Sequence, residues 1–119
     1  MAATGTLTSL NISWCGITGA GAAHLAEGVG KSASLATLNL HGNQIGDSGA
    51  QALGAALAAT STLTSLNLWD CEISGAGAAH LAEGVGKSAS LATLHLHGNL
   101  IEDSGAQALG AALDRKSVV

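Results

Sequence analysis

The chain has 119 residues, of which 47% are hydrophobic, mostly alanine and leucine, with no phenylalanine, tyrosine or proline. It carries four Lys or Arg residues against eight Asp or Glu residues, and the basic ones are scattered apart from Arg115-Lys116. This argues against nucleic acid as a partner, because a nucleic-acid site needs a clustered basic surface. The length and composition of the chain predict one domain, residues 1–119, with a core of small and medium aliphatic side chains.

A pattern of apolar residues begins at Leu7 and recurs at Leu35, Leu63 and Leu91, 28 residues further along each time. It reads LxxLxLxx(N/C)xI, and Gly-Ala and a longer apolar stretch follow it. Repetition at this period indicates a solenoid, in which each unit stacks on its neighbours because it is too small to bury its own core. We therefore divide the chain into four repeats, 7–34, 35–62, 63–90 and 91–118.

Each repeat predicts a strand and then a helix. The first apolar residues have the spacing of a strand and a turn, and the later ones have the spacing of a helix. Strands are expected near residues 8–12, 36–40, 64–68 and 92–96, and helices near 19–30, 47–58, 75–86 and 103–113.

Two features predict where the helices begin. Ser48-Gly-Ala-Gln51 and Ser104-Gly-Ala-Gln107 fit a capping box, in which the serine accepts from a free backbone N–H and the glutamine reaches back. A glycine also stands at the same early helical position of every repeat. It is expected to let the helix approach the strand layer without a Cβ in the way; the four are Gly21, Gly49, Gly77 and Gly105.

The repeat pattern resembles leucine-rich repeats of the ribonuclease-inhibitor type, from Leu7 to about Leu113. The ninth position alternates between Cys15 or Cys71 and Asn43 or Asn99, which resembles the two alternating repeat types of that family. The resemblance implies an α/β solenoid with parallel strands on the concave face and helices on the convex face. It also implies that the ninth side chain faces inward and bonds the backbone of neighbouring turns. The coil is expected to be right-handed, as about 98% of such crossovers are.

The two cysteines lie two repeats apart, which separates stacked parallel strands by about 9.6 Å. A disulfide spans at most about 7 Å between Cα atoms, so both are expected to be buried, reduced thiols.

The N-terminal residues do not resemble a signal peptide. The uncharged run from Ser48 to Trp69 contains polar residues, and its leucines keep the phase of the repeat, so the run is predicted as core rather than as a membrane span. We expect a cytoplasmic protein if it is natural, and a recombinant soluble one if it is designed.

Differences between the repeats are confined to a few positions. Repeats one and three differ only in the strand end and the following loop, and residues 19–32 are copied unchanged as 75–88. Such copying favours a designed or idealised repeat protein over a recent natural duplication.

In the family that the chain resembles, binding residues usually lie on the concave face. The predicted function is therefore a scaffold without catalytic activity that offers this face to a protein or peptide. A competing interpretation is that the variable residues serve only solubility or concentration measurement. The candidate binding residues are Ser13, Trp14, Asn39, His41, Asn67, Trp69, Asp70, His95 and His97.

Histidines provide an alternative function. His95 and His97 alternate along one predicted strand, about 6.6 Å apart on the concave side, and Asp70 is a conceivable third ligand for Zn²⁺ or Cu²⁺. His41 is two strands from His97, which argues against convergence, so solvated histidines are the other interpretation. His24 and His80 are expected on a solvated convex face.

No catalytic pattern accompanies these residues. The sequence has no nucleophile elbow, P-loop or HExxH helix, and neither cysteine is paired with a histidine and an orienting acid. We expect no enzyme activity and no cofactor.

The first repeat predicts self-association. Its strand is an open parallel edge beside the apolar Leu7, Leu10 and Ile17, and exposed strand edges invite pairing. A two-fold contact is the commonest closed arrangement, so a homodimer through the N-terminal repeat is expected.

Overall fold

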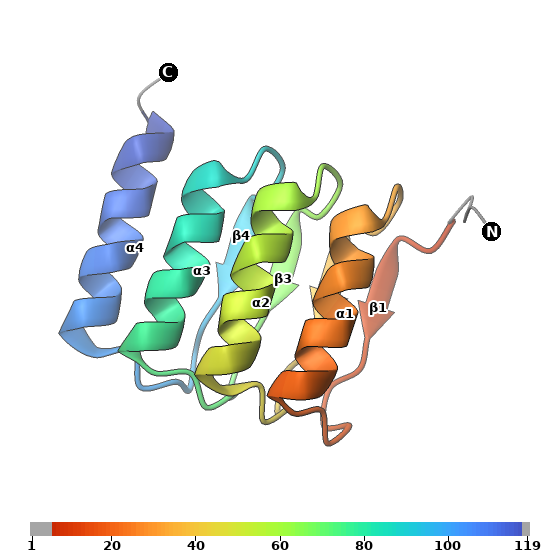
Figure 1. Ribbon diagram of the computed structural model, residues 1–119, viewed down its shortest axis with the longest axis horizontal. Helices are drawn as coiled ribbons and strands as arrows, with labels where there is room; N and C mark the ends of the chain where they lie inside the picture. Colours follow the sequence, from red (N-terminus) through yellow and green to blue (C-terminus); the bar gives the residue numbers. More distant parts are fainter. Residues whose placement is uncertain (1–5, 118–119) are drawn as a thin grey trace.

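The computed structural model describes residues 6–117, with side chains described as far as Asp114. Four strands alternate with four helices along this part of the chain (Figure 1). Their bounds are β1 (Ser9–Asn11), α1 (Gly19–Lys31), β2 (Thr37–Asn39), α2 (Gly46–Ala59), β3 (Ser65–Asn67), α3 (Gly75–Lys87), β4 (Thr93–His95) and α4 (Glu102–Ser117).

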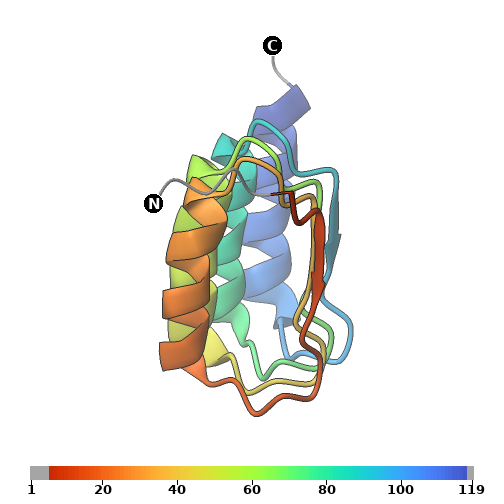
Figure 2. The same cartoon turned by 90° about the vertical axis from the view of Figure 1, so that its right-hand side faces the viewer.

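The strands form one parallel sheet in the order β1-β2-β3-β4. Each residue of a strand pairs with the residue 28 positions further along in the next strand, as in Leu10 with Leu38 and Leu38 with Leu66. Helices form a second layer on one face of this sheet, which is plain when the molecule is viewed from the side (Figure 2). The predicted α/β solenoid of four repeats is confirmed. The strands are shorter than expected, at three residues each, because the chain turns into the loop after the fifth position of the repeat.

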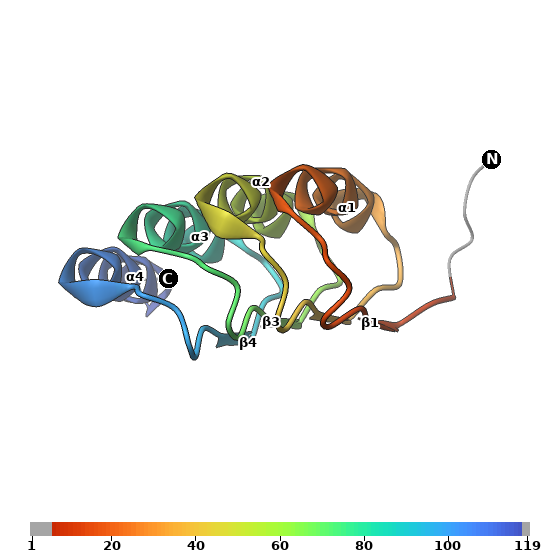
Figure 3. The same cartoon turned by 90° about the horizontal axis from the view of Figure 1, so that it is seen from below.

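The two layers are not equally wide. Seen from below, the helices are spread more widely than the strands, so the row of repeats curves with the strands on its inner side (Figure 3). Parallel strands are about 4.8 Å apart, whereas packed helix axes are 8–10 Å apart. The strand side is therefore the concave face.

The core lies between the layers and is completely buried only in the two central repeats. Leu38, Leu40, Leu66 and Leu68 are fully covered, as are the isoleucines and leucines behind them. The corresponding residues of the first and fourth repeats, such as Leu10 and Leu94, are only partly buried. A repeat therefore needs a neighbour on both sides to close its core.

The capping-box prediction is wrong. Helix α2 begins at Gly46, with Ile45 as its N-cap and no side-chain capping bond, so Ser48 lies inside the first turn. The Gly46 N–H instead donates to Cys71 O at 3.0 Å, and the positive φ of Gly46, 65°, turns the chain into the helix before the serine is reached. In the fourth repeat α4 likewise begins at Glu102, ahead of Ser104.

The glycines at the helix starts do permit a close approach, but to a different partner. A Cβ added to Gly49 would lie 2.5 Å from Cγ2 of Ile45 and 3.1 Å from Cβ of Ala22, which belongs to the preceding helix. Space is therefore needed for the loop isoleucine and the neighbouring helix rather than for the strand layer.

The uncharged run from Ser48 to Trp69 covers most of α2 and all of β3. Within the described residues, none of the helices combines the length and the hydropathy that crossing a membrane requires.

Candidate functional site on the concave face

One aromatic or imidazole ring from each repeat meets its neighbour on the concave face. The ring centroids of Trp14 and His41 are 5.2 Å apart, those of His41 and Trp69 are 4.7 Å apart and nearly parallel, and those of Trp69 and His97 are 5.6 Å apart edge to face. We call these four residues the aromatic ladder. Such separations are typical of attractive ring contacts, so the four side chains support one another across the sheet.

Trp14 reaches the ladder from an unexpected place. His41, Trp69 and His97 occupy the seventh position of their repeats, but Trp14 occupies the eighth, in the loop, where its φ is 55°. A Cβ added to Gly42 would lie 2.5 Å from Cε2 of Trp14. The indole therefore lies over the bare backbone of Gly42, and the absence of a side chain there makes room for it.

Asparagines beside the ladder have a structural role that the sequence did not indicate. The Oδ1 atoms of Asn39 and Asn67 accept the backbone N–H of His41 at 3.0 Å and of Trp69 at 2.9 Å. The two asparagines thereby hold the turn that presents each ring.

The same bond in the first repeat involves residues that play no part in the ladder. Asn11 accepts both the N–H of Ser13 and its hydroxyl, at 3.1 and 2.6 Å, so Ser13 is turned toward its own loop. In the fourth repeat the asparagine is replaced by His95, whose ring lies 6.4 Å from that of His97.

A cavity of about 350 Å³ opens beside Trp14 and is lined by residues of three successive repeats. Its lining includes Trp14, Asp70 and Glu72 and contains no Lys or Arg. Asp70 and Glu72 both stand in the left-handed backbone region, with φ of 56° and 60°. Glu72 was not predicted as a site residue, although its place among the few variable loop positions was a usable signal. The full lining is Trp14, Gly16, Gly42, Asn43, Gln44, Asp70 and Glu72.

The proposed metal ligands do not come together. Among the described residues, no three His, Cys, Asp or Glu side chains lie close enough to hold a metal ion. The Trp69 ring is in contact with both His41 and His97, so the indole separates these two imidazoles. The metal-binding alternative therefore has no support in this part of the chain.

A family model described as Leucine Rich repeat matches residues 6–26, 31–54, 60–82 and 87–110, well over half of the chain. The chain belongs to the leucine-rich-repeat family. No curated protein sequence matches it.

The fold is also similar to a solved structure, leiomodin-1 actin-binding site 2. The two superpose with a TM-score of 0.82 at 22% sequence identity, over 91% of this chain and 64% of the other. The present chain thus spans less than two thirds of the length of that solved structure.

Behind the concave face of this leucine-rich-repeat domain, Asn43 joins two repeats. Its Oδ1 accepts the N–H groups of Cys15 at 3.0 Å and Ile17 at 3.1 Å. Its Nδ2 donates to the carbonyls of Ile12 at 3.0 Å and Leu40 at 2.9 Å. All of its hydrogen-bonding groups are directed at backbone. Asn99 makes the equivalent bonds between the third and fourth repeats.

The cysteines at the same position differ from each other. Cys71 is buried, and its thiol donates to Leu40 O at 3.1 Å. Burial raises the pKa of the Cys71 thiol above its usual value. Cys15 was predicted to be buried as well, and this is wrong, because it is exposed. Leu40 and its repeat cover Cys71, whereas the described residues include no repeat on that side of Cys15.

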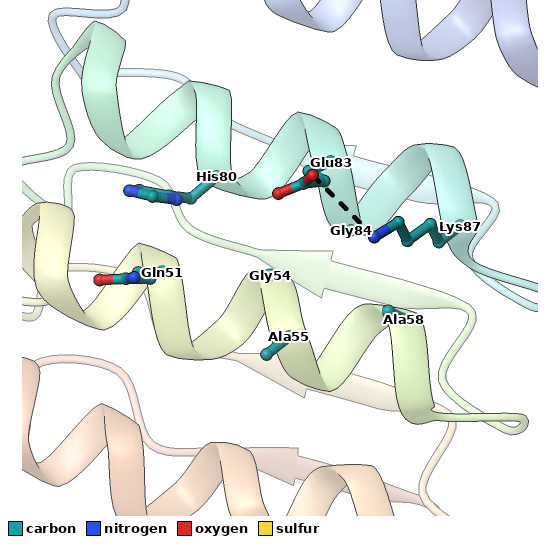
Figure 4. Close-up of a pocket in the computed structure, with 8 residues that line it drawn as sticks. All are labelled: Gln51, Gly54, Ala55, Ala58, His80, Glu83, Gly84 and Lys87. Atoms are coloured by element: carbon teal, nitrogen blue, oxygen red, sulfur yellow. Dashed lines mark ion pairs between the residues drawn. The ribbon is translucent and has the colours of Figure 1, made fainter.

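The convex face carries the remaining histidines and a shallow groove. His24 is exposed and His80 is half-buried, where it lines a groove of about 430 Å³ between α2 and α3 with Gln51 and Glu83 (Figure 4). Glu83 pairs with Lys87 at 3.9 Å on the solvent side. Exposed pairs of this kind are worth little in stability, and the groove offers no grouping of chemistry comparable to the aromatic ladder.

Proposed function

We propose that the protein is a non-catalytic scaffold of the ribonuclease-inhibitor type that binds a basic, extended segment of a partner protein on its concave face. The observation that carries the proposal is the exposure of the two tryptophans, 68% for Trp14 and 45% for Trp69. Large aromatic side chains held in a row and left open to solvent are typical of protein interfaces.

The charge of the partner segment follows from the cavity beside Trp14. An arginine or lysine placed there contacts the face of the indole, an attraction of about 0.5–2 kcal/mol, and reaches the carboxylates of Asp70 and Glu72. The chain carries a net charge of −4, which steers a basic segment toward it.

Two further observations support a scaffold role. Leiomodin-1 actin-binding site 2 is named for a protein ligand, and the shared fold supports protein binding while specifying no partner for this chain. The unchanged copying of residues 19–32 as 75–88 supports an idealised or engineered origin.

The proposal is tested by titrating a short oligoarginine peptide into the protein and following tryptophan fluorescence, with an oligoglutamate peptide of equal length as the negative probe. We expect saturable binding of oligoarginine only. Trp14→Ala is expected to weaken it about tenfold, which corresponds to about 1.4 kcal/mol.

A matched pair of variants separates a site from general attraction between charges. Asp70→Asn/Glu72→Gln removes two carboxylates from the cavity, and Glu27→Gln/Glu83→Gln removes two from the convex helices. Only the first pair is expected to weaken binding. Equal loss in both pairs, or no binding by the parent protein, contradicts the proposal.

Self-association through the end repeats belongs to the same proposal. Leu7 is 57% exposed in the first repeat and Leu113 is 63% exposed in the fourth, whereas their counterparts Leu63 and Leu57 are buried. A second copy of the chain is the partner that these apolar ends favour.

A further inference from the structure

The two ends of the repeat row carry different surfaces. We define the head face as the outward side of the first repeat and the tail face as the outward side of the fourth. The head face presents Leu7, Leu10, Cys15, Thr18 and Gly28. The tail face presents Leu94, Leu96, Asp103, Gly110 and Leu113.

A contact within the molecule shows what such surfaces fit. Where the second repeat meets the third, the Asp47 carboxylate accepts the backbone N–H of Ser74 at 2.8 Å and its hydroxyl at 2.6 Å. These bonds lower the pKa of Asp47 below its usual value, with the Ser74 hydroxyl as the main cause. Gly54 of α2 and Gly84 of α3 allow the two helix backbones into direct contact (Figure 4). A Cβ on Gly84 would lie 2.9 Å from Cα of Gly54.

The head face carries the third repeat's half of this contact. Repeats one and three are nearly identical, so Thr18 corresponds to Ser74, Gly28 to Gly84 and Cys15 to Cys71. Thr18 makes no side-chain capping bond, and a Cβ on Gly28 would meet nothing within 4 Å. These groups are therefore present without the partner that their counterparts have.

The tail face carries the second repeat's half. Asp103 corresponds to Asp47 and Gly110 to Gly54, and a Cβ on Gly110 would likewise meet nothing within 4 Å. Glu102 stands at the position of Gly46, whose N–H donates to Cys71 O. The φ of Glu102 is 60° and that of Gly46 is 65°, so the two residues have the same backbone conformation. The main-chain donor is thus directed in the same way.

The tail face also has an apolar hollow. A cavity of about 340 Å³ opens between β4 and α4, with Leu91, Leu94, Leu96, Leu109 and Leu113 among its walls. The counterparts of these five in the second repeat are all buried under the third repeat. The head face offers the matching side chains, since Leu7 and Leu10 correspond to the buried Leu63 and Leu66.

We propose that the tail face of one copy binds the head face of another and reproduces the contact between the second and third repeats. This rests on the self-association proposed above, and it specifies the geometry: β4 pairs in parallel with β1 of the next copy, and Asp103 accepts from Thr18. The two-fold contact between N-terminal repeats, which the strand edge alone suggested, would place like against like and has no counterpart in the molecule. A head-to-tail contact leaves one head and one tail free, so copies add in a row.

Two glycine variants test the geometry. Gly28→Leu places a bulky side chain on the head face, and Gly110→Leu places one on the tail face. Both sites are open in the single chain, and leucine favours helix over glycine by up to about 1 kcal/mol, so folding is preserved and is checked by circular dichroism. Ala79→Leu, on exposed helical surface away from both ends, is the matched control.

Sedimentation over a range of concentrations supplies the readout. We expect the parent and Ala79→Leu to exceed twice the monomer mass of 11.5 kDa as concentration rises, and each glycine variant alone to remain a monomer. An equimolar mixture of the two variants is expected to form a dimer and nothing larger, because the free tail of Gly28→Leu meets the free head of Gly110→Leu.

Other outcomes overturn the inference. A parent that stops at a dimer, together with a Gly110→Leu variant that still dimerises and a mixture that gains nothing, indicates the two-fold contact instead. A parent that is monomeric at all concentrations excludes both arrangements. Oligoarginine binding on the concave face is expected to be the same in Gly28→Leu as in the parent, so failure of that proposal is seen separately.

Discussion

The Oδ1 atom of Asn43 accepts a hydrogen bond at 3.0 Å from the backbone N–H of Cys15, which lies 28 residues away in the sequence. The same asparagine satisfies three further backbone groups, and it is buried. Asn43→Leu would leave these groups without partners, and one unsatisfied buried group costs about 1–3 kcal/mol. We expect at least this loss in the free energy of unfolding, measured with urea.

A substitution at the same position of the first repeat is the control. Cys15 is exposed, so Cys15→Ala is expected to unfold at nearly the parent concentration of urea. An Asn43→Leu midpoint equal to the parent's would show that the asparagine bonds do not hold the repeats together.

The two thiols are expected to react at very different rates. Cys15 is exposed, whereas Cys71 is buried with a raised pKa, and only the thiolate is nucleophilic. In dilute protein at neutral pH, a thiol reagent should modify one cysteine rapidly and the second only on unfolding. Cys15→Ser should abolish the rapid phase, and two rapid phases in the parent would contradict the burial of Cys71.

Stability should depend on pH through Asp47. The Ser74 bonds lower its pKa in the folded protein, so its contribution is complete above the unfolded value of about 3.9 and is lost as pH falls through the lowered folded value. Asp47→Asn is expected to cost about 1 kcal/mol at neutral pH, since the site is partly exposed. The difference from the parent should shrink in acid.

Asp103→Asn serves as the comparison for Asp47→Asn, because Asp103 occupies the same position in the fourth repeat and no repeat packs beside it in the part of the chain that the structure describes. In dilute protein this change is expected to leave the urea midpoint unaltered at any pH. A loss as large as that of Asp47→Asn would argue that the Ser74 bonds are not the cause.

Gly42 should tolerate substitution less well than Gly46. Both have positive φ, 78° and 65°, where a side chain costs about 1–2 kcal/mol. A Cβ on Gly42 also collides with the Trp14 ring, whereas one on Gly46 meets nothing within 4 Å. Gly42→Ala is therefore expected to be the more destabilising and to change tryptophan emission, and Gly46→Ala to leave emission as it is. Equal emission spectra would show that Trp14 does not lie over Gly42.

Repetition made the fold predictable, because a period of 28 residues with apolar strand and helix spacing leaves one way to bury the leucines. One error arose because a residue's environment depended on a neighbouring repeat, since Cys15 has the position of Cys71 without the covering repeat. The other arose from backbone conformation, since α2 and α4 begin ahead of their serines at Gly46 and Glu102, which both have a positive φ.

The candidate site was harder to predict from the sequence than the fold was. Alternation along the strand placed His41, Trp69 and His97 on the concave face, but nothing local shows that Trp14 leaves its loop to lie over a glycine one repeat away. Asn39 and Asn67 look like surface residues in sequence, and only the bonds to His41 and Trp69 show that they hold the turns. Their use in binding stays a prediction.

The alternation of asparagine and cysteine has a consequence for how this chain can change length. Asn43 bonds the first repeat to the second and Asn99 bonds the third to the fourth, while Asp47 bonds the second to the third. Two kinds of contact between repeats therefore alternate along the row. Loss or gain of a single repeat inside the row would bring together two surfaces that never meet in this molecule, so a change within the row leaves every contact between repeats intact only when repeats are added or removed in pairs.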